Sequence, residues 1–261
     1  MLKRLQLALE YLLYFFTSST RHSVHSPFVY DFTEQVLNRR KNKPVYHAIE
    51  LLRSNMLKSN TPIEVKPLGA RAGAETAIIT LKELVGRTSK SAKYCELLER
   101  ICEYYQPEIA VEIGGALGIS ALYQAAGLRN GFLVSLEGNP KSVEIARYNA
   151  EKTGTANVQF IEGLFDESLP AVLQQLPRVD YVFFDGNHTL DATLRYFEQC
   201  LAKAHEGSIF IFDDIRWSDD MLTAWEKIKK HPRVTVSIDL FMMGLVFFRT
   251  GQEREHFTLR Y

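Results

Sequence analysis

Carboxylates follow two apolar runs in the second half of the chain. Asp185 comes directly after the run YVFF, and Asp213 with Asp214 comes directly after the run SIFIF. Neighbouring parallel strands lie about 4.8 Å apart, so such runs would bring all three carboxylates to one edge of a sheet. A divalent cation such as Mg²⁺ would relieve their mutual repulsion. The alternative is that they cap helices or face solvent, as we expect of Asp219 and Asp220 at a helix N-terminus.

His188 lies three residues after Asp185, and these two residues are the candidate catalytic pair. A neutral imidazole with an ordinary pKa of about 6.5 can take the proton of a hydroxyl group at neutral pH. His188 could equally be a hydrogen-bonded loop histidine or a further metal ligand.

A glycine-rich segment, EIGGALGIS, runs from Glu112 to Ser120 and contains Gly114 and Gly118. Glycines let the backbone turn sharply near a ligand, and the first N–H groups of the next helix can bind a carboxylate or a phosphate. A dinucleotide fingerprint GxGxxG starting at Gly114 would need glycines where Ala116 and Ile119 stand. The spacing ExGxxxG therefore argues against a pyrophosphate-binding loop.

Glu137 ends the next apolar run, GFLVSLE, and is a candidate ribose ligand. An acidic side chain there can accept hydrogen bonds from ribose hydroxyls, in nicotinamide proteins and in adenosyl-methionine proteins alike. Glu137 therefore indicates a ribose-bearing ligand but does not distinguish these two kinds of protein. The glycine spacing has to distinguish them.

Residues 107–251 alternate between short apolar runs and helix-length amphipathic segments. Continuous apolar strands with helices between them predict a parallel sheet that is covered on both faces. The last two runs are joined by only a few residues, which allows only an antiparallel pair. The predicted fold is a doubly wound α/β sheet of seven strands, mostly parallel, with an antiparallel C-terminal hairpin strand. The predicted strands are IAVEIG, GFLVSLE, NVQFIEG, DYVFFDG, SIFIFDD, VTVSIDL and GLVFFRT.

Residues 1–65 are predicted to form an N-terminal helical extension. Its first segment, from Met1 to Phe16, is too short to span a membrane and lacks a cleavage site, so an amphipathic helix is favoured over a signal peptide. Docking to a membrane surface is the alternative. Ser26 followed by Pro27 predicts the start of a second helix, which continues to about Leu52.

The other boundaries follow from the same patterns. Residues 66–106 are predicted to be a loop with two lead-in helices, from Glu75 to Val85 and from Ser91 to Tyr105, and residues 252–261 to be a polar tail.

Composition excludes several classes of protein. Hydrophobic residues make up 46% of the 261 residues and charged residues 24%, which is typical of a globular protein rather than a disordered or polytopic membrane protein. The net charge of +0 provides no global attraction to nucleic acid. Cys95, Cys102 and Cys200 lack metal-binding spacing, and their odd number favours buried thiols in a reducing, cytoplasmic compartment.

The segments EIGGALGIS, LEGNP, FFDGNH and FDDIRWSDDM resemble class I S-adenosylmethionine-dependent methyltransferases, nearest the catechol O-methyltransferase-like group. The resemblance covers roughly residues 90 to 250. The segment HSPFVYD, from His25 to Asp31, is similar to the N-terminus of a poorly characterised family of bacterial methyltransferases. This resemblance implies a Rossmann-like fold, S-adenosylmethionine as cofactor and methyl transfer to a hydroxyl group of a small molecule.

The resemblance also implies roles for individual residues. The loop at Gly114 would take the methionine part of the cofactor, and Ser120 would help to bind its carboxylate. The related enzymes use Asp, Asp and Asn as metal ligands, whereas this chain has Asp214 in place of Asn, and they use a lysine base where this chain has His188. The implied cofactor-binding residues are Glu112, Gly114, Gly118, Ser120, Glu137, Gly163, Leu164, Phe165 and Asp185; the implied ligands of a Mg²⁺ ion are Asp185, Asp213 and Asp214.

Three other functions stay open. A nicotinamide oxidoreductase is opposed by the glycine spacing. An N-methyltransferase acting on nucleic acid or protein is opposed by the zero net charge and by the lack of an Asn-Pro-Pro-Tyr-like run after the fourth strand. A non-catalytic cofactor-binding module would use the apolar N-terminus to recruit a partner. We also expect the N-terminal helices to support a homodimer, and the region of His25 and Tyr30 to roof the acceptor pocket.

Overall fold

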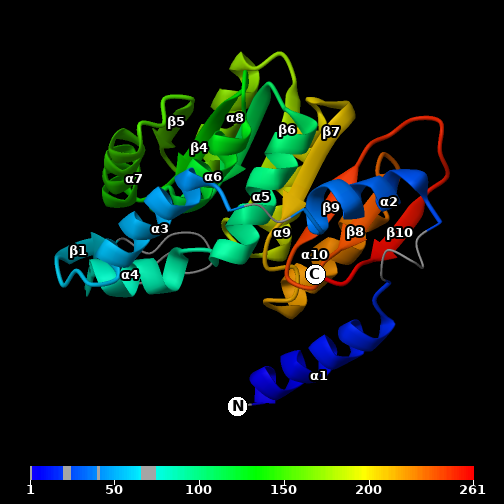
Figure 1. The fold of residues 1–261 in the computed structure, drawn as a ribbon, viewed down its shortest axis with the longest axis horizontal. Coiled ribbons are helices and arrows are strands. Elements are labelled where there is room, and N and C mark those ends of the chain that lie inside the picture. Colours follow the sequence, from blue (N-terminus) through cyan, green and yellow to red (C-terminus); the bar gives the residue numbers. More distant parts are fainter. Residues whose placement is uncertain (1, 20–24, 40–41, 66–74) are drawn as a thin grey trace.

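The computed structural model describes residues 2–19, 25–39, 42–65 and 75–261. They form a central sheet with helices on both faces and a separate two-stranded sheet (Figure 1). The predicted doubly wound α/β fold is confirmed, but the central sheet has eight strands instead of the predicted seven.

The central sheet has the strand order β10-β8-β9-β7-β6-β3-β4-β5. Strand β9 runs antiparallel to both of its neighbours, and the other pairs are parallel. The strands are β3 (Ile109–Ile113), β4 (Phe132–Glu137), β5 (Val158–Glu162), β6 (Val179–Phe184), β7 (Ala204–Phe212), β8 (Val236–Asp239), β9 (Gly244–Phe247) and β10 (Glu255–Thr258).

The direction of winding reverses between β3 and β6. The chain runs outward from β3 through β4 to β5, and then returns to place β6 on the other side of β3. The carboxyl ends of β3 and β6 stay close, because the N–H of Asp185 donates to the carbonyl of Ile113 at 2.8 Å. In open α/β sheets, ligands bind in the crevice at such a reversal.

Helices cover both faces of the sheet because strand residues alternate between two buried apolar clusters. Val111 and Val182 belong to one cluster, and Ala110 and Tyr181 to the other. The cluster of Val111 includes α8 (Phe165–Gln175), α9 (Leu190–Leu201) and α10 (Asp219–Lys229). The cluster of Ala110 includes α2 (Pro27–Phe32), α3 (Pro44–Met56), α5 (Ala92–Tyr105), α6 (Ile119–Gly127) and α7 (Pro140–Thr153).

The N-terminal half differs from the prediction in two places. The helix expected from Ser26 to Leu52 is broken into α2, a π-helical turn at Thr33–Leu37 and α3, whose first residue is Pro44. A proline lacks the N–H that an interior helix position needs, so the break had a signal in the sequence.

The lead-in helix expected from Glu75 begins later, as α4 (Leu81–Thr88). Thr80 caps α4 through a reciprocal bond pattern with Glu83, and the β-branched residues before it form β2 (Ala77–Thr80), which pairs with β1 (Pro62–Val65). Residues 66–74, at the start of the predicted loop, lie outside the described residues.

The predicted polar tail is also partly wrong, because it adds the edge strand β10. This strand pairs in parallel with β8, and Leu259 just after it is buried. The hydroxyl of Tyr14 donates to the carbonyl of Leu259, which ties the tail to α1 (Leu2–Thr17). Burial of Leu259 and partial burial of Phe257 explain why this charged segment packs against the sheet.

Helix α1 stands apart from the rest of the molecule in Figure 1. It contacts the body through the rings of Tyr11 and Tyr14, which lie 5.0 and 5.2 Å from the ring of Phe241. Leu13 and Phe16 are 67% and 78% exposed. No helix among the described residues is long and apolar enough to cross a membrane.

Two glycines provide a matched test of the packing between α5 and α6. A Cβ at Gly127 would overlap the carbonyl oxygen of Glu99 and lie 2.7 Å from the Cβ of Cys102, whereas a Cβ at Gly86 in α4 would meet nothing within 4 Å. We expect Gly127→Ala to lower the free energy of unfolding by about 1–3 kcal/mol. Gly86→Ala should raise it by about 0.5–1 kcal/mol. Urea unfolding of both variants measures this difference, and equal effects would contradict the close contact.

Candidate functional site

Backbone strain is concentrated at the carboxyl edge of the sheet. Among the described residues other than glycine, a positive φ occurs at Gln106, which ends α5, and at four residues of the carboxyl-edge loops. Each such residue costs on the order of 1–3 kcal/mol and persists only where the surroundings fix it, which is common at functional sites. The four are Ala116 (φ 43°), Asn187 (φ 51°), Asp214 (φ 52°) and Phe241 (φ 73°).

The loop between β3 and α6 requires its glycines. Gly114 has φ +100°, and a Cβ there would overlap the carbonyl oxygen of Asp185 across the β3/β6 crevice. Gly118 has φ +80°, and a Cβ there would lie 3.0 Å from the Cβ of Ala146. No described side chain caps the N-terminus of α6, so its first N–H groups are available to an anionic group.

The buried carboxylate of Glu112 lies next to this loop and organises a hydrogen-bond network. Glu112 is fully buried and accepts hydrogen bonds from Ser120, Gln124 and Ser135, each at 2.6 Å. Burial raises the pKa of Glu112, and the three donors oppose that rise. A Cβ at Gly115 would overlap the hydroxyl of Ser135, so the loop lies directly on this network.

The hydroxyl of Ser120 is therefore engaged by Glu112 inside the protein. Glu112 and Ser120, both predicted as cofactor-binding residues, therefore bond to each other beneath the glycine loop. Gln124 and Ser135 were not predicted, because their distance to Glu112 depends on how β4 and α6 pack against β3.

Glu137 lies beside the glycine loop at the end of β4. Its carboxylate accepts hydrogen bonds from the N–H of Ala116 at 2.9 Å and from the N–H of Asn139 at 2.8 Å. Burial raises its pKa, and these backbone donors oppose the rise. A carboxylate has about four acceptor positions, so Glu137 retains capacity to accept from a ribose hydroxyl group besides its backbone donors.

Residues 163–165, which are predicted to bind the cofactor, follow β5 next to Glu137. The N–H of Gly163 donates to the carbonyl of Glu137 at 3.1 Å, which places the end of β5 next to β4. Leu164 is exposed. The ring of Phe165 lies against Gly186, since a Cβ added at Gly186 would be 2.5 Å from that ring. The segment 163–165 thus connects the Glu137 side of the edge with the loop after β6.

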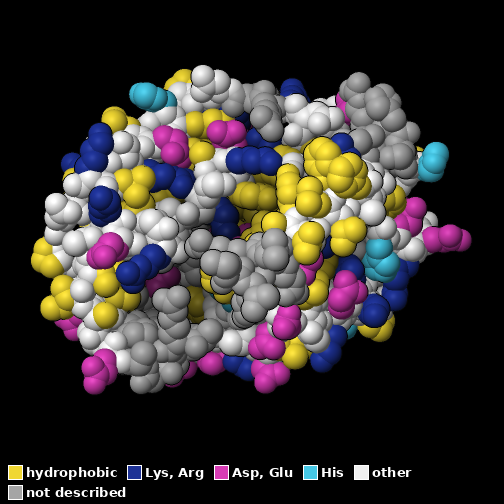
Figure 2. Space-filling model, turned by 90° about the horizontal axis from the view of Figure 1, so that it is seen from below, with side chains coloured by type: hydrophobic (Ala, Val, Ile, Leu, Met, Phe, Trp, Pro, Cys, Tyr) yellow, Lys and Arg dark blue, Asp and Glu magenta, His cyan; other side chains and the backbone are white. Residues whose placement is uncertain are grey.

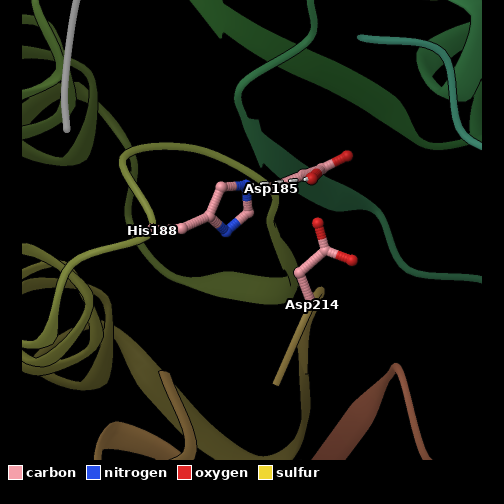
Figure 3. Close-up of side chains that lie close together, drawn as sticks. All are labelled: Asp185, His188 and Asp214. Carbon is pink, nitrogen blue, oxygen red and sulfur yellow. Dashed lines mark ion pairs between the residues drawn. The ribbon is translucent and has the colours of Figure 1, made fainter. Parts of the chain in front are cut away.

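Asp185, His188 and Asp214 lie together at the ends of β6 and β7 (Figure 3). One ligand atom from each lies within 4.8 Å of the others, and the Nε2 of His188 is 3.6 Å from the Oδ1 of Asp185. Burial, with help from nearby carboxylates, raises the pKa of Asp185 to about 7. Burial also lowers the pKa of His188, so its imidazole is neutral at neutral pH.

Asp213 is not part of this group, because it forms an ion pair with Lys90 instead. Its side chain is 1% exposed and is paired with the ammonium of Lys90, which also lies 3.6 Å from the Oδ1 of Asp214. Of the three carboxylates predicted as one ligand set, only Asp185 and Asp214 lie beside His188, and Asp213 faces Lys90 instead. Lys90 was not predicted, because it comes from the connection between α4 and α5, far from the strand ends in the sequence.

The region expected to roof the site lies elsewhere. The ring of Phe28 packs against Phe247 at 4.9 Å, and Phe247 pairs with Ile209, away from the carboxyl end of β7. His25 lines a shallow depression with Arg249 on that side. Helix α1, through Phe241 in the turn after β8, is the N-terminal element at the carboxyl edge.

The face seen from below in Figure 1 carries a hollow with hydrophobic and basic side chains around it (Figure 2). Trp217, in the loop after β7, is 64% exposed, whereas Trp225 is buried in the core and donates to Asp239 at 3.3 Å. Trp217 is therefore the tryptophan that can contact a ligand.

Comparison with known proteins agrees with this geometry. A family model described as a methyltransferase domain matches residues 111–215. A catechol O-methyltransferase from Niastella koreensis is 28% identical over 126 residues, which cover 47% of this chain and 55% of that protein. A catechol O-methyltransferase from Mycobacterium tuberculosis is 28% identical over 131 residues, which cover 49% and 58%. The chain thus spans little more than half the length of these relatives.

Solved structures share the fold. A putative O-methyltransferase from Klebsiella pneumoniae has a TM-score of 0.59 at 18% identity, covering 84% of this chain and 96% of its own. An O-methyltransferase from Bacillus cereus in complex with SAH has a TM-score of 0.56 at 20% identity, covering 84% and 97%. The predicted resemblance to class I S-adenosylmethionine-dependent methyltransferases is confirmed.

Proposed function

We propose that this protein transfers a methyl group from S-adenosylmethionine to a hydroxyl oxygen of a small molecule. The observation that carries the proposal is the glycine loop at the β3/β6 crevice, with the uncapped N-terminus of α6 on one side and Glu137 on the other. The names of the two curated relatives make a catechol the first acceptor to test.

The residues at this edge fit the cofactor. The N–H groups of α6 would bind its carboxylate, Glu137 would accept from its ribose hydroxyls, and residues 163–165 would border its adenine. When bound, S-adenosylmethionine supplies a methyl group on a positively charged sulfur, which the acceptor oxygen takes while the electron pair of the broken bond stays on sulfur.

The chain itself has to align the acceptor and remove its proton. His188 is neutral because burial lowers its pKa, so its Nε2 can accept a hydroxyl proton. Asp185, 3.6 Å from that nitrogen, would then stabilise the imidazolium that forms. No covalent intermediate with the protein is needed.

Assistance by a divalent cation such as Mg²⁺ remains a prediction. The described residues whose positions would suit such an ion are Asp185, His188 and Asp214, where its charge would polarise the acceptor hydroxyl if it were bound. Asp213 does not fit the predicted set, because Lys90 is paired with it. None of the steps above depends on a metal. A cytoplasmic location and a homodimer through the N-terminal helices also remain proposals.

Glu137→Gln tests the cofactor site. The substitution removes a charged acceptor from the ribose hydroxyls, and hydrogen bonds to charged groups contribute about 1.5–3 kcal/mol, so affinity for S-adenosylhomocysteine should fall roughly 10- to 100-fold. Glu144→Gln, an exposed change in α7, should leave it unchanged. Isothermal calorimetry gives both values. A wild-type protein that binds NADH and not S-adenosylhomocysteine would instead support the oxidoreductase alternative.

His188→Gln tests the proposed base. A base works only when neutral, and the pKa of His188 lies below its ordinary value, so kcat should rise with pH through the acidic range and level off near neutral pH. His188→Gln should lower kcat by about 100-fold or more and remove the rise in the acidic range, and only the ionisation of Asp185 near pH 7 should stay.

Asp185→Asn is the matched control for this pH profile. Because the pKa of Asp185 is itself near 7, the variant removes that ionisation, while a dependence due to His188 stays and shifts to lower pH as the imidazolium loses its carboxylate partner. The profile is measured from release of S-adenosylhomocysteine with a catechol as acceptor between about pH 5 and pH 8. An unchanged kcat and profile in His188→Gln would exclude His188 as the base.

A further inference from the structure

Lys90 brings a positive charge to the acidic edge from outside the strands that form it. It lies between α4 and α5, and its side chain is 15% exposed. Its ammonium is ion-paired with Asp213 and lies 3.6 Å from the Oδ1 of Asp214. Lys90 therefore compensates the negative charges of Asp213 and Asp214, which follow β7.

Asp213 depends on this lysine. The carboxylate is 1% exposed, and apart from the ion pair neither of its oxygens accepts a hydrogen bond from any residue the structure describes. A buried carboxylate without a partner is strongly destabilising, so a cation is required beside Asp213 in the folded protein.

The backbone of Lys90 is itself fixed by the N-terminal helices. Its carbonyl accepts a hydrogen bond from the guanidinium of Arg53 in α3. Arg53 pairs with Glu50 at 3.1 Å, and Glu50 accepts from the hydroxyl of Tyr123 in α6 at 2.9 Å. The backbone at Lys90 is thus held by α3, and α3 is in turn tied to α6.

A divalent ion and this ammonium would compete for the same carboxylate. The candidate metal ligands are Asp185, His188 and Asp214, and the Oδ1 of Asp214 lies 3.6 Å from the ammonium of Lys90. An ion bound to Asp214 would lie close to a fixed positive charge in a partly buried site, where repulsion between like charges is strong.

We propose that Lys90 is the resident cation of this site: it neutralises Asp213 and Asp214, lets the protein act without a metal, and keeps divalent ions from Asp185, His188 and Asp214. The effect of Lys90 on activity rests on the proposed methyl transfer. Its effect on metal binding does not, and metal binding can be measured without any substrate.

The test compares Lys90→Met with Lys229→Met by titration with Mn²⁺. Lys229 is a matched control, because its side chain is 20% exposed and paired with Glu226 in α10. We expect weak binding to the wild type and to Lys229→Met, and an affinity about tenfold or more higher in Lys90→Met. Tight binding to the wild type, or equal affinities in all three proteins, would overturn the proposal.

Two further variants cover the possibility that Lys90→Met does not fold. The double variant Lys90→Met/Asp213→Asn removes the cation together with the buried charge that needs it, and keeps the three candidate ligands. It should bind Mn²⁺ as tightly as Lys90→Met is expected to, whereas Lys90→Arg should bind it as weakly as the wild type. The reverse order of affinities would refute the role of the Lys90 charge.

Activity in excess chelator provides the second readout. The wild type should retain its rate of methyl transfer, and Lys90→Met should lose it and recover when Mg²⁺ or Mn²⁺ is added. Loss of wild-type activity in chelator would overturn the proposal. A wild type that fails to bind S-adenosylhomocysteine would refute the proposed function, while the Mn²⁺ titrations would still decide the role of Lys90.

Discussion

Repulsion among carboxylates is the constraint on which the rest of this site depends. Parallel winding brings acidic residues from β3, β4, β6 and β7 to one edge of the sheet, where burial penalises their charged forms. Three of them are compensated in different ways: Glu112 by side-chain donors, Glu137 by backbone N–H groups and Asp213 by Lys90. Lys90 also lies 3.6 Å from Asp214, whereas Asp185, with a pKa raised to about 7, lies beside His188, so the least compensated acid is the one placed where chemistry can use it.

The N-terminal helices take part in this compensation. Arg53 in α3 fixes the backbone of Lys90, and Tyr11 and Tyr14 in α1 contact Phe241 in a strained turn at the same edge. The N-terminal extension therefore contacts the site in two places. Helix α3 holds the backbone of Lys90, and α1 lies beside the carboxyl edge of the sheet. The region of Phe28 packs on another part of β9.

The features that could be predicted from the sequence are those that depend on local residue patterns. Apolar runs located the parallel strands, their last residues identified Glu137 and Asp185, and glycine spacing at Gly114 and Gly118 located the strained loop. Lys90 could not be found in this way, because its role comes from the approach of α4 and α5 to the end of β7. The network of Glu112 with Gln124 and Ser135 likewise depends on packing between elements. Pro44 is different: it signalled the break before α3, and that signal was outweighed by the apolar period around it.

The most direct measurement follows the methyl group itself. The protein is incubated with a catechol and with S-adenosylmethionine carrying a ¹³C-labelled methyl group, and the product is examined by NMR. We expect a labelled methyl group on oxygen, formed in equal amount with S-adenosylhomocysteine and absent with heat-unfolded protein. Labelled methyl on nitrogen across a panel of acceptors, or no affinity for either sulfur compound, would contradict it.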